Sequence, residues 1–128
     1  LSAKSERKLR AKAQDALAWA GALDLADKTP SELTYPETKR VSIARAIVKK
    51  PKIMFCDEPT GALDENNAKE VLGVIQKLNE IYNTTVVLIS HNPSIGVMAD
   101  RIVKLNNGEI VEIIKNKEKR PASEIVWG

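Results

Sequence analysis

Two amphipathic helices are predicted in the first third of the chain. The first covers residues 5–20, where apolar residues recur at steps of three or four. These apolar residues are Leu9, Ala13, Leu17 and Ala20. The second covers residues 38–49; Pro36 suits its first turn, where a missing N–H costs little, and Pro51 ends it. This third of the chain is therefore expected to be helical.

Two short apolar runs predict buried β-strands, at residues 53–56 and 85–89. Between them, apolar residues repeat at i, i+3, i+4 and i+7 and predict a helix that Asp64 caps. The members of this repeat are Val71, Val74, Ile75 and Leu78. The order strand–helix–strand predicts a parallel sheet, and continuously apolar strands are typical of a sheet covered on both faces. The fold class is therefore expected to be α/β.

A β-hairpin is predicted after the second strand. Apolar runs over residues 102–105 and 109–114 flank Asn107-Gly108, a dipeptide that favours a two-residue hairpin turn. A short helical stretch is expected over residues 93–100. The chain is thus expected to consist of a helical part (1–50), an α/β core ending in the hairpin (51–114) and a polar C-terminal tail (115–128).

The composition excludes several classes of protein. With 128 residues, 43% of them apolar and 29% charged, the chain is at most one domain with a real core, and it is not intrinsically disordered. The longest apolar stretch, residues 16–23, has eight residues, against the ~20 needed to span a bilayer. One cysteine and one histidine exclude an internal disulfide and a structural zinc site. A soluble, intracellular chain without a signal segment is expected.

Positive charge is concentrated near the N-terminus. Residues 1–50 carry eleven Lys/Arg and six Asp/Glu (net +5), whereas residues 51–128 carry nine and eleven (net −2). The surplus comes largely from Lys4, Arg7, Lys8, Arg10 and Lys12. Such a patch could suit nucleic acid, but no aromatic residue lies near it to stack on a base. We interpret it as a solvated helix face and expect no nucleic-acid partner.

Candidate catalytic residues follow both predicted strands. Asp57-Glu58 comes after the first strand and His91 after the second, and parallel strands bring their carboxyl ends to one crevice. One carboxylate suits a hydrated Mg²⁺, the other can orient or deprotonate a nucleophile, and the histidine can contact a phosphate or orient a water. The alternative is a pair of solvated turn residues and a surface histidine. Cys56 is expected to be a small buried hydrophobe rather than a reactive thiol.

Taken in order, these residues resemble the ATP-binding subunits of ABC transporters. Residues 53–57 (Ile-Met-Phe-Cys-Asp) resemble the Walker B strand, and residues 59–64 (Pro-Thr-Gly-Ala-Leu-Asp) resemble the D-loop. Residues 40–46 resemble the helix that follows the family's signature motif. The amino-acid sequence of residues 57–64 is most similar to that of exporters of the macrolide-efflux and lipoprotein-release type. The resemblance implies part of a P-loop NTPase domain of the ABC type, namely its C-terminal half.

The resemblance also implies roles and partners. Asp57 would bind Mg²⁺ through water, Glu58 would polarise the attacking water, His91 would contact the γ-phosphate of ATP, and Asp64 would couple two sites across a dimer. The implied cofactors are ATP and Mg²⁺. The implied partners are a transmembrane permease subunit and a second ATP-binding subunit, identical or different. The implied location is cytoplasmic, on the inner face of the cell membrane.

The signature motif departs from the family. The family reads Leu-Ser-Gly-Gly-Gln or Leu-Ser-Gly-Gly-Glu where this chain has Leu33-Thr-Tyr-Pro-Glu37. Thr34 keeps a hydroxyl for the γ-phosphate, and Thr34 and Glu37 are the ATP-contacting candidates here. Tyr35 adds bulk and Pro36 removes an N–H donor where the family has glycines. We expect a weakened signature; the alternative is that Tyr35 folds aside and the helix end still attracts phosphate.

No Gly-x-x-x-x-Gly-Lys-Ser/Thr phosphate loop occurs in these 128 residues. We therefore expect a fragment, inactive alone, of a subunit that when intact binds and hydrolyses ATP to power export or extraction through a membrane partner. The alternative is a degenerate, non-catalytic ABC-like interaction module. An ABC ATPase of DNA repair or translation fits less well.

Overall fold

The helical part of the chain forms two α-helices that meet near one end of the first. In the computed structural model, which describes residues 2–128, Ser2 caps α1 by accepting a hydrogen bond from the Ser5 N–H at 3.1 Å. Short 3₁₀ turns (Leu23–Leu25 and Pro30–Glu32) then lead to α2. Both predicted helices are confirmed, with α1 beginning two residues and α2 three residues earlier than expected. Their bounds are Ala3–Trp19 for α1 and Tyr35–Ile47 for α2.

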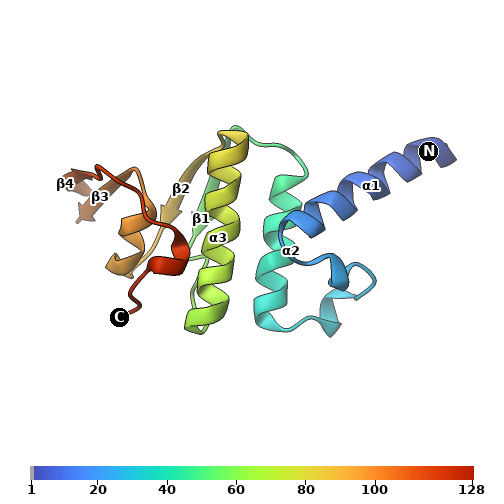
Figure 1. Ribbon diagram of the computed structural model, residues 1–128, viewed down its shortest axis with the longest axis horizontal. Coiled ribbons are helices and arrows are strands. Elements are labelled where there is room, and N and C mark those ends of the chain that lie inside the picture. The colour runs from blue at the N-terminus through green and yellow to red at the C-terminus, as the bar shows by residue number, and fades with distance from the viewer. Residues whose placement is uncertain (1) are drawn as a thin grey trace.

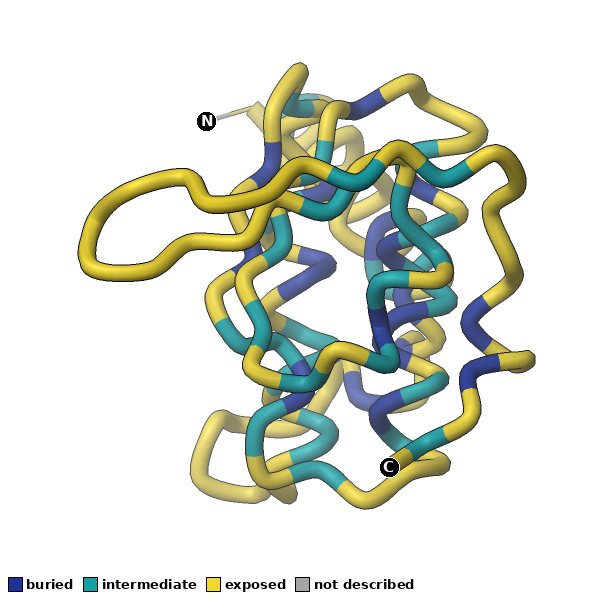
Figure 2. Tube along the Cα trace, turned by 90° about the vertical axis from the view of Figure 1, so that its left-hand side faces the viewer, coloured by how far each residue is buried: buried dark blue, intermediate teal, exposed yellow. Residues whose placement is uncertain are grey.

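The α/β part follows the predicted order (Figure 1). Strands β1 and β2 pair in parallel, in a register that joins Ile53 to Thr85 and Asp57 to Ile89. The hairpin of β3 and β4 forms around Asn107-Gly108, as predicted, and stands out from the body as a long exposed loop in Figure 2. The remaining elements are β1 (Ile53–Asp57), α3 (Glu65–Tyr82), β2 (Thr85–Ile89), the 3₁₀ turn Pro93–Met98, β3 (Arg101–Asn106), β4 (Glu109–Lys115) and the 3₁₀ turn Ala122–Glu124.

The main core lies between α3, one face of the sheet and the two N-terminal helices. Met54 and Cys56 of β1 face α3, whose buried side chains include Val71 and Ile75. Ile43 of α2 belongs to the same cluster of buried residues. The residues that repeat along α3 at helical spacing thus do what the pattern predicts: they hold the helix against the strands.

The expectation that both faces of the sheet are covered is wrong. Side chains alternate across a strand, and only one alternate set of β1 is buried. The other set is exposed: Ile53 by 54% and Phe55 by 74% on β1, and Val87 and Ile89 on β2 by 41% and 50%. Side chains of α2 border Ile53 and Phe55, but within residues 2–128 this face stays largely open. The apolar runs correctly predicted strands, but they say nothing of what covers each side.

Part of the predicted polar C-terminal tail packs on the body of the molecule. Ala122 and Ile125 are each only 2% exposed, in a cluster with Leu72 of α3. The side chain of Gln76 donates to the Arg120 carbonyl at 3.0 Å and accepts from the Ala122 N–H at 3.0 Å. We call residues 116–125 the C-terminal strap, because they run across α3 and are tied to it.

None of the helices formed by residues 2–128 is both long enough and apolar enough to cross a membrane.

Candidate functional site

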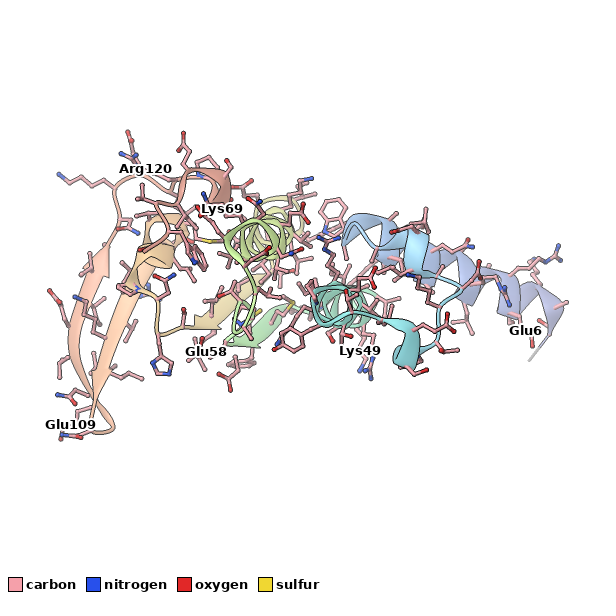
Figure 3. The ribbon with its side chains drawn as sticks, turned by 90° about the horizontal axis from the view of Figure 1, so that it is seen from below. Glu6, Lys49, Glu58, Lys69, Glu109 and Arg120 are labelled. Carbon is pink, nitrogen blue, oxygen red and sulfur yellow. The ribbon has the colours of Figure 1, made fainter. Side chains whose placement is uncertain are left out.

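The two strand ends that carry the candidate catalytic residues lie side by side. Asp57 is paired with Ile89 in the parallel register, and the Glu58 N–H donates to the Ile89 carbonyl at 2.9 Å. This bond continues the pairing one residue beyond β1, so Glu58 lies at the carboxyl end of the sheet (Figure 3). Its Oε1 atom is 3.3 Å from Nε2 of His91. The predicted meeting of the two strand ends is thus what the structure shows.

The carboxylate of Glu58 is held by an unusual backbone. Its φ of +49° lies in the left-handed region, and its carbonyl accepts the Gly61 N–H at 3.1 Å, which closes a tight turn. Oε1 is shielded from solvent, and no group within residues 2–128 makes an aligned hydrogen bond to it. Shielded carboxylate oxygens normally have such a partner, and the polar group recorded beside this one is the His91 ring; the Glu58 side chain as a whole is 34% exposed, so it still reaches solvent.

His91 and Asp57 lie next to Glu58, and the side chains of both are exposed. The His91 side chain is 95% exposed, so the ring is free to contact a further group while it stays beside Glu58. Asp57 is exposed and shares the open sheet face with Phe55. Its carboxylate is a ligand type that Mg²⁺ accepts, yet residues 2–128 hold no cluster of three or more metal-ligating side chains. A magnesium ion here would therefore depend on water and phosphate oxygens, as Mg²⁺ in nucleotide sites does.

Asp64 has a clear structural task. Its carboxylate caps α3, accepting from the Asn67 N–H at 2.9 Å and from the Asn67 side-chain amide at 2.7 Å. The turn from Glu58 to Asp64 is thereby held at both ends, by this cap and by the bond from the Glu58 N–H to Ile89. Within it, Ala62 has a left-handed backbone with a φ of +60°. A role for Asp64 in coupling two sites remains a prediction.

The altered signature forms a self-capped helix start. The Thr34 hydroxyl accepts from the Glu37 N–H at 3.4 Å, while the Glu37 carboxylate accepts from the Thr34 N–H at 2.9 Å. The hydrogen bond from the Thr34 backbone lowers the pKa of Glu37, and Lys28 acts in the same direction. Pro36 occupies the first turn and contributes no N–H, and Lys39 lies over the half-exposed Tyr35 ring at 5.2 Å.

The six candidate residues fall into two groups. Glu58, Asp57 and His91 lie together at the strand ends, with Asp64 at the far end of the same turn. Thr34 and Glu37 begin α2, and within residues 2–128 no hydrogen bond or ion pair joins them to the first group. Both groups nevertheless belong to the lower side of Figure 1, where α2 and α3 begin and toward which β1 and β2 run.

Sequence reasoning assigned no role to Arg40, which ties the two groups together. Its guanidinium donates to the Asn67 side-chain oxygen at 3.2 Å and pairs with Glu70. Asn67 lies in the first turn of α3 and also bonds to Asp64, which caps that helix. The bond from Arg40 therefore fastens α2 to the start of α3. Cys56, as expected, is buried, and burial raises the pKa of its thiol to about 11, which leaves it unreactive near neutral pH.

Comparison with known proteins finds one family. Residues 2–61 match the family model described as ABC transporter. The macrolide export ATP-binding/permease protein MacB of Salmonella typhimurium is 38% identical over 116 residues, which are 90% of this chain and 18% of that protein. The bacitracin export ATP-binding protein BceA of Halalkalibacterium halodurans is 38% identical over 101 residues, which are 78% of this chain and 40% of that protein.

The fold agrees with the sequence relatives. The dimeric structure of MJ0796, a bacterial ABC transporter cassette, superimposes with a TM-score of 0.75 and 33% identity, over 90% of this chain and 49% of that one. The chain thus spans about half the length of this cassette and less than half of the curated relatives it matches. The chain is therefore homologous to the ATP-binding domain of ABC transporters of the MacB and BceA type and corresponds to part of that domain.

Proposed function

We propose that this chain is the C-terminal half of the ATP-binding domain of an ABC exporter, and that the complete domain hydrolyses ATP to drive transport through a membrane partner. The observation that carries the proposal is the pair of Glu58 and His91, 3.3 Å apart at the ends of adjacent parallel strands. A partly exposed carboxylate beside an exposed imidazole suits the activation of a water next to a phosphate.

Each residue has one task in this proposal. Glu58 would accept a hydrogen bond from the attacking water and take its proton as the oxygen–phosphorus bond forms and the bond from the γ-phosphorus to the bridging oxygen breaks, releasing ADP. His91 orients toward the transferred phosphoryl group. Asp57 would hold a hydrated magnesium ion, which would supply positive charge beside the phosphates. Asp64 keeps the turn in place by capping α3. Catalysis of this kind is mostly positioning and charge stabilisation.

The proposal requires groups that residues 2–128 do not supply. The phosphates of ATP need a loop of backbone N–H groups and a lysine, and the motif for that loop is not in this sequence. We infer that an upstream half of the domain supplies it and also packs against the open sheet face. A second ATP-binding subunit and a transmembrane permease subunit complete the assembly, at the inner face of the membrane.

A chimaeric cassette tests the proposal. Residues 2–128 would replace the corresponding half of MJ0796, so that the chimaera contains a phosphate loop, and release of inorganic phosphate from Mg-ATP would be measured. We expect hydrolysis by the chimaera, but neither hydrolysis nor saturable millimolar-range ATP binding by the 128-residue chain. A chimaera that binds ATP without hydrolysing it would contradict the proposed function. Saturable binding by the chain alone would contradict the need for an upstream phosphate loop.

The signature supplies a second prediction in the same chimaera. The start of α2 already uses the Thr34 hydroxyl and the Glu37 carboxylate to cap itself, and Pro36 offers no donor. A missing hydrogen bond to a charged phosphate costs about 1.5–3 kcal/mol. Changing Tyr35→Gly and Pro36→Gly together is therefore expected to raise turnover about tenfold or more. A matched variant, Ser31→Gly in the preceding 3₁₀ turn, should leave turnover unchanged.

The same experiment addresses the second candidate function, a non-catalytic interaction module. The observation that favours it is the self-capped helix start with Tyr35 and Pro36 in place of glycines. If the double glycine variant hydrolyses ATP no faster than the parent chimaera, and both are slow, the interaction module becomes the better account. A large gain would instead show a working site that the two residues weaken.

A further inference from the structure

The formal net charge of the chain resides in one short segment. Residues 2–15 contain five Lys/Arg and two Asp/Glu, a net charge of +3, which equals the net charge of the whole chain. The remaining residues carry fifteen Lys/Arg and fifteen Asp/Glu and are neutral overall. We call residues 2–15 the basic arm; its cations are Lys4, Arg7, Lys8, Arg10 and Lys12.

The basic arm projects from the body of the molecule. Apart from Ser5, which is half-buried, all of its residues are exposed, and α1 becomes buried only at Ala16 and Ala20, where it packs on α2. Figure 1 shows the N-terminal turns of α1 extending beyond the other elements, and Figure 3 places Glu6 at the opposite end of the molecule from Glu109 of the hairpin. Within residues 2–128 no other element packs on the arm.

The charges of the basic arm are not compensated within the described chain. None of its five cations forms an ion pair or a side-chain hydrogen bond with another of residues 2–128. A helical spacing of 3.6 residues per turn places Lys4, Lys8 and Lys12 along one side of α1, with Arg7 next to them. The arm therefore presents a continuous positive surface about three turns long.

We propose that the basic arm binds the anionic headgroups of a membrane surface. The arm has one large apolar residue, Leu9, so it lacks both the apolar face of an inserting helix and the aromatic anchors of a protein interface. No aromatic residue lies in the arm to stack on a base, which disfavours single-stranded nucleic acid. A surface of Lys and Arg side chains that has no apolar face and no aromatic anchor suits the phosphate headgroups of a lipid bilayer.

The expected binding is weak and depends on salt. Each Lys or Arg near an anionic membrane surface strengthens binding about fivefold. Five cations opposed by two anions then predict a dissociation constant on the order of 10 mM in accessible lipid. Such contact becomes significant when a membrane partner already holds the domain nearby, because the effective lipid concentration is then high. The arm would orient the domain against the membrane rather than recruit it from solution.

Vesicle co-sedimentation of the 128-residue chain tests the proposal without nucleotide, so its result is independent of the proposed ATPase. Vesicles of phosphatidylcholine alone would be compared with vesicles that also contain phosphatidylglycerol. The test variant is Lys4→Gln, Lys8→Gln and Lys12→Gln together. The matched control removes three exposed lysines elsewhere, Lys49→Gln, Lys50→Gln and Lys52→Gln. Circular dichroism would confirm that both variants are folded.

We expect binding only to the anionic vesicles, at least tenfold weaker binding by the arm variant, and less than a threefold change in the control. Added salt should abolish binding by the parent chain. Equal loss in the two variants would overturn the proposal, because the charge of the chain rather than the arm would then be responsible. Equal binding to neutral vesicles would also overturn it, as would tighter binding to duplex DNA than to anionic vesicles at the same salt concentration.

Discussion

Replacing Glu58 with glutamine is expected to slow ATP hydrolysis by about 100-fold or more in the chimaeric cassette, while ATP binding is retained. Glutamine has the same shape as glutamate, but it does not accept a proton from water. The left-handed turn should be unaffected, because the Glu58 N–H to Ile89 bond involves only backbone. Phosphate release and equilibrium binding of Mg-ATP would be measured on the same preparation.

A matched substitution separates loss of the base from loss of charge. Glu109→Gln removes one carboxylate at the exposed hairpin, far from the strand ends, and should leave turnover within twofold of the parent. Hydrolysis that survives Glu58→Gln at the parent rate would show that another group activates the water. A fall in both variants would point to a general effect of charge on the cassette.

Shortening Ile125 to alanine is expected to destabilise the chain by about 2–5 kcal/mol, as for other fully buried isoleucines. Ile125, the last residue of the C-terminal strap, is 2% exposed and packs with Leu72 and Ile95. The neighbouring Val126 is 85% exposed, so Val126→Ala is a control that should change stability by less than about 0.5 kcal/mol. Urea unfolding followed by circular dichroism measures both variants. Equal midpoints would contradict the packing of the strap.

The packing of the C-terminal strap on α3 could not be predicted from the sequence pattern. Its anchors, Ala122 and Ile125, are two apolar residues within a mostly polar stretch, too few to define a period. What holds the segment is tertiary: the Gln76 side chain bonds to two backbone groups of the strap. Such contacts are made between residues more than forty positions apart, and local pattern carries no information about them.

The elements themselves, by contrast, followed from local rules. The apolar period predicted α3, Asp64 its cap, and Asn107-Gly108 the hairpin turn. The parallel pairing of β1 and β2 followed from the helix between them, and it brought Glu58 and His91 together as expected. The left-handed backbone of Glu58 and the bond from Arg40 to Asn67 did not follow, because each depends on the packing of several segments at once.

The open face of the sheet has a consequence for cation binding. Asp57 shares that face with Phe55 and Ile53, so at present water surrounds its carboxylate. Whatever covers the apolar side chains also removes water from the acid beside them and lowers the local dielectric constant. The attraction between Asp57 and a divalent cation then strengthens, since Coulomb energy varies inversely with that constant. Completion of the fold and affinity for the ion are thereby thermodynamically linked.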